Sequence, residues 1–252
     1  MEYIELDKTN FDIKKKLLSS GYESEIFLYP YEDREILIKK YYDLDQVNIN
    51  KIEMISKLKT RFLIKPSKLI KVENEVIGFS MDYMKCFYPI NILKNIMSDE
   101  DKYNLLITLK SEIENLREQD CIYGDLSLNN VITDGINVRL CDSVNVKIDS
   151  YNFDQISSKM RKYFDLKGTY NGIDCYMLNL LTIYLFNSID YDQILDLIEE
   201  NLFLKFNNKE YINYRGMMDN QECMSICYNM ISKDVSDEFL IDYIKIKKEK
   251  IM

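Results

Sequence analysis

Tyr123-Gly124-Asp125-Leu126-Ser127-Leu128-Asn129-Asn130 is the most informative segment of this 252-residue chain. It has the form D-x-x-x-x-N and stands between a helix, predicted from Ser98 to about Gln119, and a short strand predicted at Val131–Thr133. Farther on, Asp142 ends the predicted strand Val138–Cys141. This order suits phosphoryl transfer, in which one carboxylate orients the attacking hydroxyl while an amide oxygen and a second carboxylate hold magnesium.

The composition excludes several kinds of chemistry. The formal charge of −9, from 42 acidic and 33 basic side chains, argues against nucleic acid as a partner, because nucleic-acid binding relies on clustered Lys and Arg. The sequence has no histidine, so imidazole-based catalysis and His-ligated metal sites are excluded. No secretory leader opens the chain, and no apolar stretch approaches the about 20 residues of a membrane span. We therefore expect a cytoplasmic protein with no membrane partner.

The predicted elements divide the chain into a strand-rich front and a helix-rich back. Strands are predicted at Tyr3–Leu6, Ile26–Tyr29, Glu35–Tyr41, Leu69–Val72 and Val76–Tyr83, with a helix at Asn50–Lys59 between them. Further helices are predicted at Ile173–Phe186, Tyr191–Leu202, Gln221–Ser232 and Glu238–Lys248. No Gly/Ser-rich or Pro-rich linker interrupts the sequence. We expect one α+β, bilobal domain over residues 1–252, with a small β-rich lobe of residues 1–84 and a larger helical lobe of residues 85–252.

With these elements in place, the chain resembles the protein-kinase-like superfamily, since YGDLSLNN stands where the catalytic loop H-R-D-x-x-x-x-N stands. The resemblance implies that Asp125 is the catalytic carboxylate. It also implies that Asn130 and Asp142 bind the metal, with Asp142 in the place of the Asp of D-F-G.

Two upstream segments extend the resemblance. Ile36-Leu37-Ile38-Lys39 resembles the V-A-I-K strand, which makes Lys39 the implied phosphate-contacting lysine and Glu53 the partner of its ammonium group. The stretch from Ser19 to Ile26 occupies the place of the glycine-rich loop and keeps one of its glycines. The stretch from Gly78 to Met84 looks like the strand that enters the adenine-binding hinge. The implied nucleotide-binding residues are Ser19, Gly21, Ser24, Ile26, Lys39, Met81, Asp82, Tyr83 and Met84.

A downstream segment, Asp174-Cys175-Tyr176-Met177-Leu178-Asn179, looks like the D-x-W-S-L-G segment of the superfamily. The resemblance implies a structural role for Asp174, which would support the backbone of the catalytic loop. The run Asp237–Asp242 looks like bacterial protein-kinase relatives.

The chain also departs from the kinase pattern. Tyr123 and Gly124 replace the His and Arg of H-R-D, and Ser143 and Val144 replace the Phe and Gly of D-F-G. Gly-Asp resembles the H-G-D of aminoglycoside and choline phosphotransferases, which phosphorylate small alcohols. Because no arginine precedes Asp125 to receive a phosphate, we expect a loop that orders without phosphorylation.

We therefore expect a bacterial serine/threonine protein-kinase-like enzyme. It would use Mg²⁺ or Mn²⁺ and ATP to transfer the γ-phosphate to a hydroxyl, that of a protein serine or threonine. Two alternatives stay open: a small-molecule kinase of the aminoglycoside/choline type, and a nucleotide-binding pseudokinase that acts as an interaction module. The glycine-poor loop and the altered D-F-G are the features that favour the pseudokinase.

Overall fold

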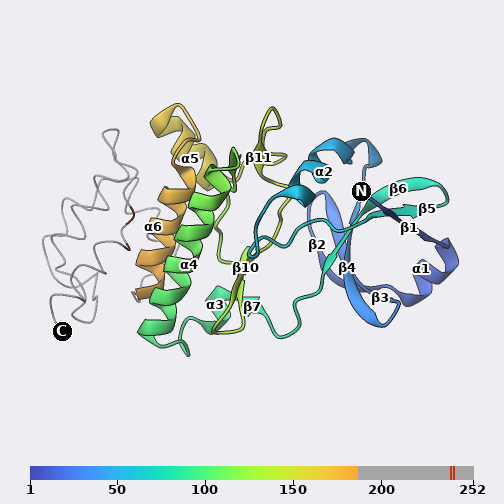
Figure 1. Ribbon diagram of the computed structural model, residues 1–252, viewed down its shortest axis with the longest axis horizontal. Coiled ribbons are helices and arrows are strands. Elements are labelled where there is room, and N and C mark those ends of the chain that lie inside the picture. Colours follow the sequence, from blue (N-terminus) through green and yellow to red (C-terminus); the bar gives the residue numbers. More distant parts are fainter. Residues whose placement is uncertain (187–238, 240, 242–252) are drawn as a thin grey trace, which may run out of the picture. The chain divides into compact units, whose positions relative to one another are not determined.

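The computed structural model describes residues 1–186, 239 and 241 (Figure 1). They fall into two compact units. The first unit comprises Met1–Phe87 together with Cys141–Val144, and the second comprises Tyr88–Leu140 together with the described residues from Asn145 onward. The helices predicted at Tyr191–Leu202 and Gln221–Ser232 lie outside the described residues. The helix predicted at Glu238–Lys248 and the run Asp237–Asp242 also lie outside them, apart from Phe239 and Ile241.

The first unit is built on a six-stranded sheet with the order β1-β5-β6-β4-β3-β2. Its elements in chain order are β1 (Tyr3–Leu6), α1 (Lys8–Lys14), β2 (Lys16–Ser20), β3 (Ser24–Tyr31), β4 (Arg34–Tyr41), α2 (Ile49–Lys57), β5 (Leu69–Val72) and β6 (Glu75–Asp82). β1 runs parallel to β5, and the other neighbouring strands pair antiparallel. The strands predicted at Tyr3–Leu6 and Leu69–Val72 are confirmed with the same bounds.

One face of this sheet carries an apolar core. The Phe11 ring of α1 lies 5.8 Å from the ring of Phe27 and 5.8 Å from that of Tyr29, both on β3. Ile36 and Ile38 of β4 are buried in the same cluster, as alternation along a strand requires. The odd-numbered residues of β4, Lys39 among them, therefore project from the opposite face.

α1 and β2 were not predicted from the sequence. The exposure of nearly all their residues explains why. Phe11 is the one buried residue of α1, and all five residues of β2 are exposed. Neither segment has the apolar repeat from which a helix or strand is predicted. β2 is instead held by its pairing with β3 at one edge of the sheet.

The second unit places two long helices beside two small sheets. Its elements are β7 (Tyr88–Pro89), α3 (Ile90–Leu93), α4 (Asp99–Arg117), β8 (Cys121–Ile122), β9 (Val131–Thr133), β10 (Val138–Leu140), β11 (Lys147–Ile148), α5 (Ser158–Lys167) and α6 (Ile173–Phe186). The sheets are β10-β9-β7 and β11-β8. The predictions of β9 and α6 are confirmed with the same bounds.

Helix α4, predicted from Ser98, begins with a capping box. The Ser98 hydroxyl accepts the backbone N–H of Asp101 at 3.1 Å, and the Asp101 carboxylate accepts the backbone N–H of Ser98 at 3.3 Å. α4 packs against α6, which is buried along its length from Ile173 to Leu185 (Figure 1). A helix that is apolar on all sides forms the centre of a core. Within the part of the chain that the structure covers, no helix has both the length and the apolar character needed to cross a membrane.

Candidate functional site

In the first unit, one face of the sheet gathers residues for which nucleotide binding was predicted. The strand register pairs Ile26 with Ser19 on one side and with Lys39 on the other, and it pairs Leu37 with Met81 and Ser24 with Tyr41. Residues directly opposite each other in neighbouring strands project from the same face. The strand pairing therefore aligns five of the predicted nucleotide-binding residues on one face: Ser19, Ser24, Ile26, Lys39 and Met81.

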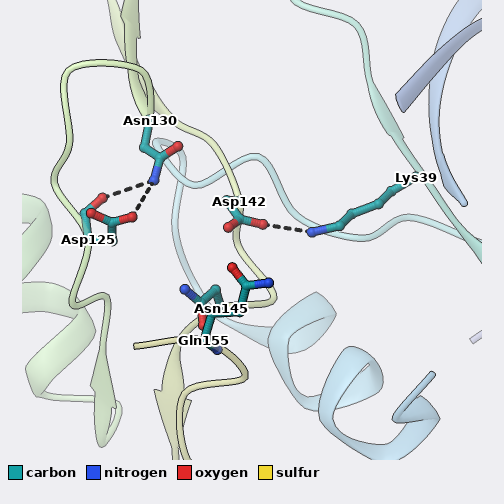
Figure 2. Close-up of polar contacts among 6 residues, drawn as sticks. All are labelled: Lys39, Asp125, Asn130, Asp142, Asn145 and Gln155. Atoms are coloured by element: carbon teal, nitrogen blue, oxygen red, sulfur yellow. Dashed lines mark hydrogen bonds and ion pairs between the residues drawn. The ribbon is translucent and has the colours of Figure 1, made fainter. Parts of the chain in front are cut away.

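Lys39 forms an ion pair with Asp142. The Lys39 ammonium donates to the Asp142 carboxylate at 2.7 Å (Figure 2). The Lys39 side chain is 12% exposed and that of Asp142 is 35% exposed, so part of the acidic group faces solvent. Asp142 has a φ of 50°, a left-handed conformation that Asp and Asn tolerate better than most residues. The backbone turns at this residue as it presents its carboxylate to the lysine.

Gly78 is a structural residue beside Lys39 to which the sequence gives no separate role. It pairs with Lys40 across β6 and β4, and a Cβ at this position would lie 1.9 Å from the carbonyl oxygen of Lys39. β6 can therefore approach β4 beside Lys39 only because residue 78 has no side chain. A single glycine within an apolar strand was the available signal, since such a glycine often marks a close approach of two backbones.

Glu53, the predicted partner of Lys39, lies on α2 and makes a different ion pair. Its carboxylate accepts from the N-terminal ammonium of Met1, which holds the pKa of the Glu53 carboxyl below its ordinary value. In the structure the predicted Lys39–Glu53 pair is thus replaced by two others, Lys39–Asp142 and Met1–Glu53.

The turn that stands in place of a glycine-rich loop does not use the special backbone freedom of glycine. The N–H of Gly21 donates to the carbonyl of Ser24 at 2.9 Å, and a Cβ on Gly21 would make an ordinary contact of 3.6 Å with the same oxygen. Ser19 is exposed and Ser24 is buried. This turn is held by a backbone hydrogen bond and has room for a side chain at residue 21.

The predicted hinge residues differ in their exposure. Met81 is buried on β6, and Asp82 is exposed at the end of that strand, where its carboxylate lies 3.5 Å from the guanidinium of Arg34. Tyr83 and Met84, which follow the strand, are partly buried. Met81 is therefore the member of this group that contributes a buried side chain to the sheet.

In the second unit, Asp125 and Asn130 lie next to each other. The side-chain amide of Asn130 donates to the Asp125 carboxylate at 3.0 Å and to the Asp125 backbone carbonyl at 3.2 Å (Figure 2). Between them the chain turns, and the N–H of Asn130 donates to the carbonyl of Ser127 at 3.1 Å. Leu126 is fully buried and anchors the loop. The Asn130 donor orients the Asp125 carboxylate, and the amide oxygen of Asn130 is the atom that suits a metal.

Asp174 supports this loop, as predicted. Its buried carboxylate accepts the backbone N–H of Tyr123 at 2.9 Å and that of Gly124 at 2.6 Å. Burial raises the pKa of the Asp174 carboxyl, while the two N–H groups and the positive charge of Arg117 oppose that rise. One carboxylate at the start of α6 thus fixes the two residues that precede Asp125.

The predicted metal ligands have the oxygen donors that magnesium prefers. Mg²⁺ in phosphoryl-transfer sites takes one or two protein oxygens and fills its other positions with water and substrate phosphate. Asp142 in the first unit offers a carboxylate of this kind, and Asn130 in the second unit offers an amide oxygen. Among the described residues no group of three or more acidic or cysteine side chains is placed to hold a metal. Each of the two predicted ligands taken by itself therefore has a donor that suits magnesium.

No protein-family model matches the chain, and no curated protein matches it. The first unit offers an ammonium and a carboxylate in contact, suited to phosphate oxygens and to a cation. The second offers a carboxylate oriented by an amide, suited to accept a proton from a hydroxyl.

Proposed function

We propose that the protein is an ATP-dependent phosphotransferase that moves the γ-phosphate of Mg-ATP to a hydroxyl, that of a protein serine or threonine. In this proposal the fold is a bilobal protein-kinase-like domain. Lys39 binds nucleotide phosphates, Asn130 and Asp142 hold magnesium, and Asp125 orients the acceptor hydroxyl and takes its proton. Bound magnesium would neutralise negative charge on the phosphate oxygens.

The observation that carries the proposal is the contact between Lys39 and Asp142. The sequence points to these two residues through different segments. Lys39 ends a segment that resembles V-A-I-K, and Asp142 follows the strand Val138–Leu140. They lie 2.7 Å apart although 103 residues separate them. Structural ion pairs on a sheet are common, but a phosphoryl-transfer site specifically needs a lysine for phosphate and a carboxylate for metal in one place.

Asp125 and Asn130 give further support. The hydrogen bond from Asn130 holds the Asp125 carboxylate in a defined orientation, in which it can still act as an acceptor. A general base acts through such an orientation, since it must meet the hydroxyl proton at hydrogen-bond distance. Asp174, which holds the two preceding backbone N–H groups, limits the motion of the loop.

One observation favours a second candidate, a nucleotide-binding pseudokinase. The Glu53 carboxylate is paired with the Met1 ammonium, and Lys39 has Asp142 as its acidic partner. In active protein kinases a lysine–glutamate pair orients the lysine toward phosphate. A pseudokinase would bind nucleotide with Lys39 and Asp142 in this arrangement but would not transfer phosphate.

Phosphotransfer and nucleotide binding, measured separately, test the two candidates. Purified protein is incubated with γ-labelled ATP and Mg²⁺ or Mn²⁺, with itself and a generic basic protein as acceptors, and ATP affinity is measured by calorimetry. We expect turnover in the wild type and a loss of two orders of magnitude or more in Asp125→Asn, with ATP affinity retained. The Asn side chain keeps an oxygen that can accept the hydrogen bond from Asn130. Asp125→Asn therefore removes the carboxylate while it preserves this contact.

Three other results would revise the proposal. Wild-type ATP binding without transfer to protein, or to a panel of aminoglycosides and choline, would establish the pseudokinase. Transfer to a small alcohol alone would establish a small-molecule kinase. Full turnover in Asp125→Asn would remove Asp125 from the catalytic role.

A further inference from the structure

Gly124, the residue before Asp125, is in contact with an aromatic ring. A Cβ at Gly124 would lie 2.5 Å from Cε1 of Phe153 and 3.1 Å from the methyl carbon of Met160. Gly124 also has a φ of 82°, which strains any residue with a side chain. Phe153 and Met160 are buried, so the space beside Gly124 is filled by apolar side chains.

Phe153 belongs to the segment Asn145–Ser157, which follows Asp142 and leads into α5. The side-chain oxygen of Asn145 accepts the backbone N–H of Gln155 at 2.8 Å and closes the segment into a loop (Figure 2). Within it, Ile148 and Tyr151 exchange two backbone hydrogen bonds of 2.9 Å. These hydrogen bonds close the segment into a short loop, and Phe153 lies within that loop.

The Phe153 ring connects Gly124 to the start of α6. On its other side the ring meets Tyr170 edge-to-face, with centroids 5.1 Å apart. The carbonyl of Tyr170 accepts the N–H of Ile173 at 3.1 Å, and the next residue, Asp174, accepts the N–H of Gly124 at 2.6 Å. Gly124 thus has two contacts that fix its position: its N–H donates to the Asp174 carboxylate, and the Phe153 ring packs beside its Cα.

We propose that Phe153 is a positioning residue for Asp125, and that its apolar contact with Gly124 orders the segment Asn145–Ser157 without a phosphate group. The inference rests on the proposed function for its catalytic consequence. An arginine before the catalytic aspartate would need a partner of opposite charge to hold such a segment. Here Phe153 and Met160 fill the space beside that position, and burial of the ring supplies the attraction.

Three substitutions in the full chain test the inference. Phe153→Ala removes the ring, Phe153→Leu restores apolar volume, and Ile156→Ala changes a side chain of the same segment that is 43% exposed. We expect kcat to fall tenfold or more in Phe153→Ala, with KM for ATP unchanged, and to stay within threefold of wild type in the other two. Amide hydrogen exchange at Gly124, Asp125 and residues 145–157 should accelerate in Phe153→Ala alone.

A paired substitution tests the contact with Gly124. Gly124→Ala places a methyl group against the ring, whereas Gly124→Ala with Phe153→Ala keeps the strained φ and the 3.1 Å contact with Met160 but removes the clash with the ring. If the ring leaves no room for a side chain at residue 124, the amide hydrogens of residues 123–125 should exchange more slowly in the double variant than the summed effects of the two single variants predict. Strict additivity would overturn the contact as the cause.

Three further outcomes bear on the inference. Treatment of the wild type with a protein phosphatase should leave its rate within threefold, and a large loss would show that phosphate orders the segment. If the wild type transfers no phosphate, the proposed function fails while hydrogen exchange still decides the role of Phe153. Unchanged exchange at Gly124 and Asp125 in Phe153→Ala would overturn the inference.

Discussion

Lys39 and Asp142 form an ion pair of 2.7 Å across 103 residues of sequence. The lysine projects from a central strand of the sheet, and the aspartate projects from a left-handed turn after the strand Val138–Leu140. In the proposed function, this ion pair brings the lysine that binds phosphate and the carboxylate that holds the metal together within the first unit.

Asp142→Asn should weaken Mg-ATP binding at least tenfold, because the variant loses the anionic ligand that magnesium prefers. Asn tolerates the left-handed backbone, and the partly exposed pair contributes at most about 1 kcal/mol to the free energy of unfolding. Calorimetry with and without Mg²⁺ measures the affinity. Asp142→Ala is the comparison that adds backbone strain of about 1–2 kcal/mol. Magnesium-dependent affinity equal to wild type in Asp142→Asn would exclude Asp142 as a ligand.

Gly78→Ala should lower the free energy of unfolding by at least about 2 kcal/mol, because its methyl group would lie 1.9 Å from the Lys39 carbonyl oxygen and push β6 from β4. Urea denaturation measures the change. Gly21→Ala is the matched control, since a Cβ there meets only an ordinary contact of 3.6 Å. We expect that control to be neutral or to stabilise by up to about 1 kcal/mol. Equal stability of the two variants would contradict the close approach at Gly78.

Asp174→Asn should destabilise the fold by about 2–3 kcal/mol. The carboxylate accepts two backbone N–H groups, and an amide offers one oxygen and turns a donor toward the second N–H. Thermal and urea unfolding measure the loss. Asp149→Asn, an exposed change in the same unit, should leave stability within about 0.5 kcal/mol. A neutral Asp174→Asn would show that these hydrogen bonds do not stabilise the loop.

Cys141 should resist alkylation in the folded protein. Burial, with a smaller contribution from the Asp142 charge, raises the pKa of its thiol to about 12. The thiolate fraction at pH 8 is then about 10⁻⁴, and it rises tenfold for each pH unit up to the pKa. Iodoacetamide labelling with peptide mass spectrometry should modify the exposed Cys86 at pH 8 and leave Cys141 unmodified until urea unfolds the chain. Equal labelling of Cys86 and Cys141 in the native protein would contradict both the partial burial of Cys141 and the raised pKa of its thiol.

Elements whose signals are local could be predicted from the amino-acid sequence. The start of α4 after its N-cap Ser98 is one of them, because the capping box involves residues only three positions apart. α6 and β9 are recognisable from short apolar runs. Asp125 and Asn130 are close enough in the chain for their hydrogen bond to arise within one loop.

The contacts between residues far apart in the chain became known only from the folded structure. The partner of Lys39 could not be read from the sequence, because Glu53 and Asp142 both had the right charge and the choice depends on how α2 and the turn at Asp142 pack. The requirement for glycine at residue 124 arises likewise from Phe153, which folding brings against it. Local patterns fix hydrogen bonds over a few residues, whereas contacts across a core depend on the simultaneous packing of many side chains.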